Sequence, residues 1–142
     1  MINNIYATCV AINGNGILIL GKSGVGKSDL ALRLIENKNA VLVSDDRVDV
    51  CARDNQVFAS APENIKGMLE VRGIGIIKQK YMQTAPVRLV INLADDIKKI
   101  GRMPEEKFYE IRGVKIPLAD LYPFEVSVVD KIVIKLKGIL EN

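Results

Sequence analysis

The 142-residue chain contains no histidine and no tryptophan, and it has only two cysteines. Without histidine, acid–base chemistry near neutral pH falls to carboxylates, lysine, tyrosine or cysteine. This composition also argues against a disulfide framework and against a cysteine/histidine metal site. We expect Cys9 and Cys51, which lie in strand-like stretches, to be buried free thiols.

The sequence also lacks a long apolar run and a strong excess of one charge. No stretch approaches the roughly 18 to 20 apolar residues that span a bilayer, and no signal-peptide pattern opens the chain. The net charge of +3 is too small to indicate a nucleic acid or a membrane surface as partner. With 49% hydrophobic and 26% charged residues, we expect a single globular domain over residues 1–142, located in the cytoplasm.

What the chain does contain is the phosphate-loop motif G-x-x-x-x-G-K-[ST]. Its residues are Gly21, Lys22, Ser23, Gly24, Val25, Gly26, Lys27 and Ser28. Glycines let backbone N–H groups surround one anion, and the N-terminus of a following helix adds positive charge. Lys27 can reach the β- and γ-phosphates, and the Ser28 hydroxyl can bind Mg²⁺. The alternative is a glycine-rich turn that binds nothing, which the order of strand, loop and helix disfavours.

The rest of the chain predicts an α/β fold. The expected elements are strands over residues 5–12, 17–20, 40–44, 47–51, 57–59 and 87–93, a hairpin over 108–116, and helices from about 27 to 36 and over 126–140. Asn13-Gly14-Asn15-Gly16 indicates a hairpin turn. Residues 61–67 are expected to be an irregular loop. We therefore expect a mixed β-sheet with a phosphate-loop helix and a C-terminal helix.

Two adjacent carboxylates, Asp45 and Asp46, follow the expected strand after the phosphate-loop helix. Ligands bind outside the carboxyl ends of strands in open α/β sheets, so both could face the γ-phosphate. Mutual repulsion can raise the pKa of one carboxyl group and make it a base near neutral pH. The alternative is a solvated acidic turn, which the preceding loop disfavours.

Glu70 and Arg72 form a second candidate pair within an aliphatic stretch punctuated by glycines. Charged residues are costly to bury without a partner. Glu70 could offer a carboxylate to Mg²⁺, and Arg72 could neutralise a phosphoryl group in transfer. The alternative is a surface strand with a salt bridge.

Three ordered segments resemble the catalytic domain of HPr kinase/phosphorylase. They are Gly-Lys-Ser-Gly-Val-Gly-Lys-Ser-Asp from Gly21, Val-Leu-Val-Ser-Asp-Asp-Arg-Val from Val41, and Gly-Met-Leu-Glu-Val-Arg-Gly-Ile-Gly-Ile from Gly67. The resemblance implies an ATP- and Mg²⁺-dependent protein-serine kinase that phosphorylates HPr, the phosphocarrier of a phosphotransferase system. It also implies a fold like that of phosphoenolpyruvate carboxykinase, and a homo-oligomer, in this family a hexamer.

By matching position, the resemblance gives Ser28 and Glu70 to the metal and Lys27 to the γ-phosphate. One of Asp45 and Asp46 would deprotonate the HPr serine, and the other would help to hold metal or substrate. Tyr6 stands where the family usually has a histidine, and a tyrosine is no base near pH 7. That departure weakens the expectation of the reverse activity, removal of phosphate from phosphoserine.

The chain resembles a short form of the family, as in alphaproteobacteria, that begins at the catalytic domain. Two alternatives stay open at this point. A small-molecule kinase is disfavoured because no Lys/Arg-rich helical lid follows Val87. A nucleotide-sensing module without transfer would need only the phosphate loop, not the further acidic residues.

Overall fold

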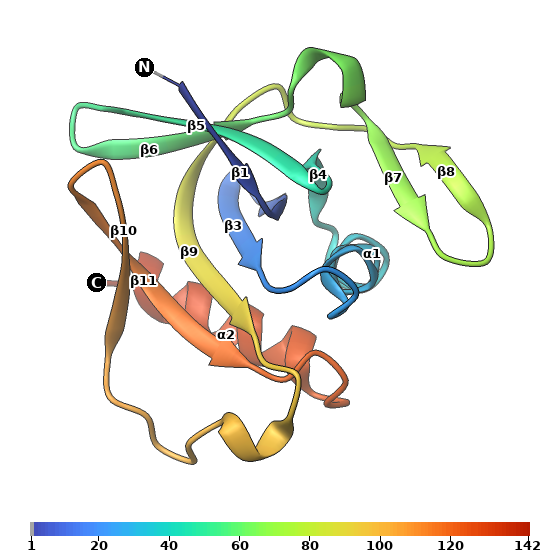
Figure 1. Ribbon diagram of the computed structural model, residues 1–142. Helices are drawn as coiled ribbons and strands as arrows, with labels where there is room; N and C mark the ends of the chain where they lie inside the picture. The colour runs from blue at the N-terminus through green and yellow to red at the C-terminus, as the bar shows by residue number, and fades with distance from the viewer. Residues whose placement is uncertain (1) are drawn as a thin grey trace.

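The computed structural model describes residues 2–142 (Figure 1). Its strands are β1 (Ile2–Tyr6), β2 (Thr8–Ile12), β3 (Asn15–Leu20), β4 (Val41–Ser44), β5 (Arg47–Arg53), β6 (Gln56–Ser60), β7 (Met68–Val71), β8 (Gly75–Lys78), β9 (Ala85–Leu93), β10 (Lys107–Ile111) and β11 (Val114–Leu121). Its helices are α1 (Lys27–Lys38), α2 (Val128–Leu140) and two short 3-10 helices, η1 (Glu63–Ile65) and η2 (Ile97–Lys99). No helix within residues 2–142 is long and apolar enough to cross a membrane.

Four strands of the main sheet end at the same edge. β3 runs parallel to β9, and β9 runs parallel to β11. On the other flank of β3, strand β2 is antiparallel to both β3 and β4, so β4 runs in the direction of β3. The carboxyl ends of β3, β4, β9 and β11 therefore share one edge, which is where open α/β sheets bind their ligands.

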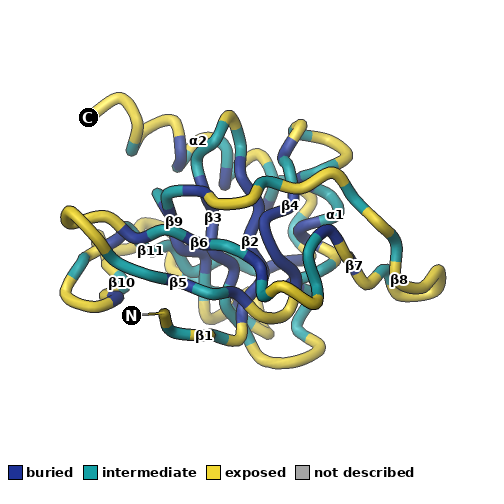
Figure 2. The backbone as a smooth tube through the Cα atoms, turned by 90° about the horizontal axis from the view of Figure 1, so that it is seen from above, coloured by how far each residue is buried: buried dark blue, intermediate teal, exposed yellow. Residues whose placement is uncertain are grey.

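Apolar side chains cover both faces of this sheet. Along β3, Ile17 and Ile19 are buried on one face with Leu30 of α1 and Ile132 of α2, and Leu18 is buried in a second cluster on the other face. Figure 2 shows the dark-blue centre of the sheet, with α2 on one side and β1 and β5 on the other. Burying each such side chain stabilises the fold by about 1.5–3 kcal/mol. The strand that leads into the glycine-rich loop is therefore held from both faces.

The stretch that we expected to be one strand, residues 5–12, is two strands with different partners. β1 pairs with β5, whereas β2 pairs with β3 and β4. The break lies at Ala7, which is fully buried and whose N–H donates to the backbone oxygen of Asp46 (3.2 Å). An apolar run carries no signal for such a change of partner, so the single-strand prediction was wrong.

Most other predicted elements are confirmed, namely the strands around β3, β4, β5, β6 and β9, the β10–β11 hairpin and both α-helices. The glycine-punctuated stretch forms the β7–β8 hairpin, a separate two-stranded sheet. Both cysteines are free, and Cys9 is buried, but Cys51 is only half-buried. The prediction of burial was wrong for Cys51 because side chains alternate along β5: Val48 and Val50 point into the core, and Cys51 lies on the opposite face. A mixed α/β fold with these two helices is confirmed.

Candidate active site

The glycine-rich loop, residues 21–26, joins β3 to α1 (Figure 1). It lies at the edge where the four strands end. Gly24 (φ 80°) and Gly26 (φ 113°) have left-handed backbone conformations that residues with a Cβ rarely adopt. Gly26 directly precedes α1 and brings no side chain to cap its first turn. The free N–H groups and the dipole at this helix terminus suit an anion.

Lys27, the first residue of α1, is 7% exposed. Its ammonium Nζ donates to the backbone oxygens of Gly21 (2.7 Å) and Lys22 (3.1 Å). Burial lowers the pKa of Lys27, while the charges of Asp46 and Asp45 act in the opposite direction. The cation is thus held across the loop, close to both carboxylates.

Asp45 is buried, with 7% of the residue exposed, and it accepts hydrogen bonds from three other segments. Its Oδ1 accepts from the Ser28 hydroxyl (2.7 Å) and from the Thr8 hydroxyl (3.0 Å). Its Oδ2 accepts from the backbone N–H of Glu70 (3.1 Å). One carboxylate therefore links α1, β2 and β7 at the end of β4.

Asp46, the next residue, is exposed and lies in the left-handed region (φ 71°), which aspartate tolerates better than most residues. Its backbone N–H donates to the Thr8 hydroxyl (3.3 Å), and its backbone oxygen accepts from Ala7. Within residues 2–142 its carboxylate makes no hydrogen bond or ion pair with the protein. The backbone is fixed, and the carboxylate is left to meet an external group.

Glu70 and Arg72 lie on the β7–β8 hairpin, and both side chains are exposed. The backbone of Glu70 reaches Asp45 through the hydrogen bond just described. The structure therefore brings together the loop, Lys27, Ser28 and both aspartates, and it places only the backbone of Glu70 against them. Roles for the Glu70 and Arg72 side chains stay predictions.

Two further titratable side chains, Cys9 and Tyr6, lie on β2 and β1. Burial raises the pKa of the Cys9 thiol to about 12. The ring of Tyr6 lies 5.9 Å from Lys27 Nζ and is stacked by the Arg47 guanidinium at 4.2 Å. Tyr6 thus contributes an aromatic face at the rim of the site.

Thr8 and the lining of a cavity were missed by sequence reasoning. The cavity, of about 590 Å³, lies on the flank of the loop away from Asp45, and it is lined by residues 21–25 and by Asn92, Leu93, Ala94, Asp95, Lys99 and Asp120. Asn92 and Asp120 face each other across β9 and β11. They could have been found only by applying the carboxyl-end rule to β11, whose full length the sequence did not predict.

No cluster of three or more histidine, cysteine, aspartate or glutamate side chains that could hold a metal is present in residues 2–142. Mg²⁺ in phosphoryl-transfer enzymes needs only one or two protein oxygens, because phosphates and water complete its coordination. The Ser28 hydroxyl donates its proton to Asp45 (2.7 Å), so its lone pairs remain free for a cation. The donor set fits Mg²⁺.

Comparison with known proteins agrees with this geometry. The family model described as "HPr Serine kinase C-terminal domain" matches residues 2–134. The chain belongs to that family. The relatives that it resembles include the HPr kinase/phosphorylase of Lactobacillus acidophilus, which is 38% identical over an alignment of 130 residues that covers 84% of this chain and 40% of the relative. The HPr kinase/phosphorylase of Caldicellulosiruptor bescii is 34% identical over 79% of this chain and 39% of the relative.

A solved structure is similar to nearly the whole of this chain. The HPr(Ser) kinase/phosphatase from Coxiella burnetii matches with a TM-score of 0.86 and 26% identity, and the match covers 99% of each chain. The chain spans only about two fifths of the length of the two curated relatives named above. Family and fold are therefore settled over nearly the whole chain.

Proposed function

We propose that this chain is an ATP- and Mg²⁺-dependent serine kinase whose substrate is an HPr-type phosphocarrier. The observation that carries the proposal is the difference in burial and hydrogen bonding between Asp45 and Asp46. A buried carboxylate that holds the Ser28 hydroxyl stands next to an exposed carboxylate that has no protein partner within the described residues and lies beside Lys27. A protein that only bound nucleotide would not need the second carboxylate.

Asp46 is the general base in this proposal, and Asp45 is a positioning residue. The serine hydroxyl of the carrier gives its proton to the Asp46 carboxylate as its oxygen bonds to the γ-phosphorus. The bond from that phosphorus to the β–γ bridging oxygen breaks, and ADP leaves with the bond's electron pair. Because Asp45 already accepts from Ser28, Thr8 and the Glu70 N–H, it is poorly placed to take a further proton.

Lys27 and the loop N–H groups stabilise the negative charge that moves during transfer. In the structure Lys27 Nζ donates to the carbonyls of Gly21 and Lys22. Phosphate oxygens would replace these carbonyls as its acceptors. The loop thus keeps the ammonium in place before the substrate arrives.

Ser28 would hold Mg²⁺, with Asp45 fixing its hydroxyl and Glu70 as a second, more mobile oxygen ligand. When bound, the metal would neutralise charge on the β- and γ-phosphate oxygens. Arg72, on the same hairpin as Glu70, would neutralise the transferred phosphoryl group from the solvent side. The glycine-rich loop would then act as a phosphate loop of the phosphoenolpyruvate-carboxykinase type.

The wider expectations also remain part of the proposal. They are a single catalytic domain over residues 1–142, a cytoplasmic location and a homo-oligomer, a hexamer by resemblance. The names of the relatives include a phosphorylase or phosphatase activity. We propose that the kinase direction dominates here, because Tyr6 stands beside Lys27 where the family usually has a histidine.

The test is transfer of label from γ-labelled ATP, with Mg²⁺, to the serine of HPr. Wild type should label the carrier, and Asp46→Asn should lower the rate by about 10²–10⁴-fold, the usual contribution of a general base. Asp54→Asn is a matched control, because Asp54 is also exposed and left-handed (φ 53°) but lies in the β5–β6 turn.

ATP affinity should be unchanged in Asp46→Asn within about threefold, since the loop is intact. Wild-type protein that binds ATP but labels no carrier would contradict the kinase proposal and favour a nucleotide-sensing module. Label on a small-molecule alcohol but not on HPr would favour a small-molecule kinase. Full transfer by Asp46→Asn would show that the base is another group.

A further inference from the structure

We propose that the cavity beside the loop is the nucleoside subsite, in which Asp120 and Asn92 accept hydrogen bonds from the ribose hydroxyls of the triphosphate. This inference rests on the proposed function, because it concerns the same substrate. It gives a role to side chains outside both the phosphate-loop motif and the pair Asp45 and Asp46. The proposed ligand is a ribonucleoside triphosphate with free 2′- and 3′-hydroxyl groups.

The direction of the bound triphosphate follows from the two flanks of β3. Ser28 and Asp45 lie towards β2 and β4, so the terminal phosphate and its metal belong on that flank. The nucleoside must then leave the loop towards β9 and β11, the other flank. The cavity begins there, since residues 21–25 of the loop form one of its walls.

The cavity has the size and the mixed lining that a nucleoside needs. Its volume of about 590 Å³ lies within the roughly 300–1,000 Å³ of small-molecule sites. Polar side chains line it from both sides: Lys22 and Ser23 from the loop, and Asn92, Asp95, Lys99 and Asp120 from the opposite wall, together with Leu93 and Ala94. Lys99 is paired with Asp95 (2.7 Å). The charge of Lys22, on the loop side, suits the phosphates, while the charge of Lys99 on the opposite wall is balanced by Asp95.

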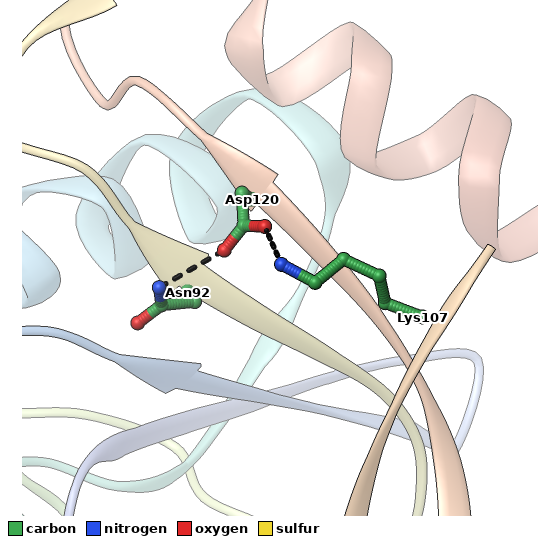
Figure 3. A network of polar contacts seen from close by, with 3 residues as sticks. All are labelled: Asn92, Lys107 and Asp120. Carbon is green, nitrogen blue, oxygen red and sulfur yellow. Dashed lines mark hydrogen bonds and ion pairs between the residues drawn. The ribbon is translucent and has the colours of Figure 1, made fainter. Parts of the chain in front are cut away.

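The Asp120 carboxylate is held in place by two donors, as Figure 3 shows. Oδ1 accepts from Asn92 Nδ2 (3.0 Å), and Oδ2 accepts from Lys107 Nζ (2.6 Å). Burial acts to raise the pKa of Asp120, but the hydrogen bonds from Lys107 and Asn92 and the Lys107 charge outweigh it, so the pKa lies below its ordinary value. Asp120 is thus an ionised acceptor at neutral pH, with lone pairs left over.

The bond to Asp120 also fixes the orientation of the Asn92 amide. An ionised carboxylate only accepts, so the NH₂ group of Asn92 must face it. The amide oxygen then points away from Asp120, as in Figure 3, and is a second acceptor. Asp120 and Asn92 thus offer one acceptor each to the two hydroxyl donors, and an acidic side chain that accepts from ribose hydroxyls is a recurrent solution in nucleotide-binding α/β folds.

The test measures direct binding of three probes, each with Mg²⁺, to the full 142-residue chain by calorimetry: ATP, 2′,3′-dideoxy-ATP and inorganic tripolyphosphate. Wild type should bind ATP on the order of tenfold more tightly than dideoxy-ATP, as expected for hydroxyl bonds to a charged acceptor. Asp120→Asn and Asn92→Leu should each shrink this ratio to below about threefold, with tripolyphosphate affinity unchanged. The ratio within one variant does not depend on the fraction of protein that is folded.

Asp130→Asn is the matched control, since Asp130 also pairs with a lysine, Lys38, at 2.6 Å but lies on α2. It should keep the wild-type ratio. A wild-type ratio near one, or a ratio that survives both Asp120→Asn and Asn92→Leu, overturns the subsite and leaves the kinase proposal standing. Failure of wild type to bind either ATP or tripolyphosphate overturns the kinase proposal itself.

Discussion

Two regions carry residues that the sequence marks as functional: the acidic corner, Asp45 and Asp46 after β4, and the β7–β8 hairpin. They differ in how far these residues are buried. Asp45 is 7% exposed and holds three donors. On the hairpin, the side chains of Glu70 and Arg72 are exposed, and Ile74 and Ile76 are 77% and 69% exposed. The corner is therefore a preorganised part of the site, and the hairpin is a surface that an incoming partner could reach.

The two regions are coupled at few points. The Glu70 N–H donates to Asp45, and the fully buried side chain of Leu69 is the anchor that packs into the cluster beneath α1, with the partly buried Val71 and Ile77 against it. Because most of its other side chains are exposed, the hairpin can adjust locally without disturbing Asp45. The comparison thus predicts that stability is determined by the corner and the anchor, and that the exposed hairpin charges affect only function.

The largest effect is expected when the anchor is removed. Leu69→Ala should lower the free energy of unfolding by about 2–5 kcal/mol, because a fully buried leucine leaves a cavity. Ile76→Ala on the neighbouring strand, where the side chain is 69% exposed, should change it by less than about 0.5 kcal/mol. Urea unfolding of both variants measures the difference. Equal losses would show that the hairpin is covered by a partner in solution.

The second effect compares two adjacent residues with the same change. Asp45→Asn should cost about 1–3 kcal/mol, because its NH₂ group must face at least one of the donors Ser28, Thr8 and Glu70 N–H. Asp46→Asn should cost less than about 0.5 kcal/mol, since the side chain is exposed and asparagine tolerates a left-handed backbone. Chemical denaturation distinguishes the two. A larger loss for Asp46→Asn would reverse the proposed roles.

Sequence patterns located the loop and the acidic corner because both depend on local order along the chain. A strand, a glycine-rich loop and a helix are read directly from residues 17–36, and Asp45 follows the next apolar run. The patterns could not separate Asp45 from Asp46. Their difference arises from Thr8, on a strand 37 residues away, and from the hairpin at Glu70.

The cavity and the break at Ala7 were not predicted from the sequence, because both depend on long-range strand pairing. Asn92 and Asp120 meet only because β11 adds to β9 in parallel, and the sequence predicted β11 only as the short return of a hairpin. β1 and β2 are separate strands because β1 pairs with β5, whereas β2 pairs with β3. Neither pairing leaves a turn signal in the residues concerned. Such features depend on tertiary contacts, which periodicity within one segment does not encode.

A smaller effect is expected at Thr8, which contacts both aspartates. Thr8→Val keeps the shape but removes the donor to Asp45 (3.0 Å) and the acceptor of the Asp46 N–H (3.3 Å). The cost should be about 1 kcal/mol, and the rate of phosphoryl transfer should fall because Asp46 loses part of its support. Thr84→Val, at an exposed threonine, is the control. An unchanged rate would mean that the Asp46 backbone is fixed by its bond from Ala7 alone.

The smallest effect on stability is expected at the exposed charges of the hairpin. Glu70→Gln and Arg72→Gln should each change the free energy of unfolding by less than about 0.5 kcal/mol, because both side chains are exposed to solvent. Glu105→Gln, in the exposed connection before β10, is the control for a change of charge alone. Transfer assays with increasing Mg²⁺ and urea unfolding are run on the same preparations.

Function should respond where stability does not. If Glu70 is a metal ligand, Glu70→Gln should raise the Mg²⁺ concentration needed for half-maximal transfer, and excess Mg²⁺ should restore much of the rate. If Arg72 neutralises the phosphoryl group, Arg72→Gln should lower the rate at every Mg²⁺ concentration. Wild-type behaviour of both variants would reduce the hairpin's part in the site to its backbone bond to Asp45. The corner and the glycine-rich loop with Lys27 would then hold the catalytic groups.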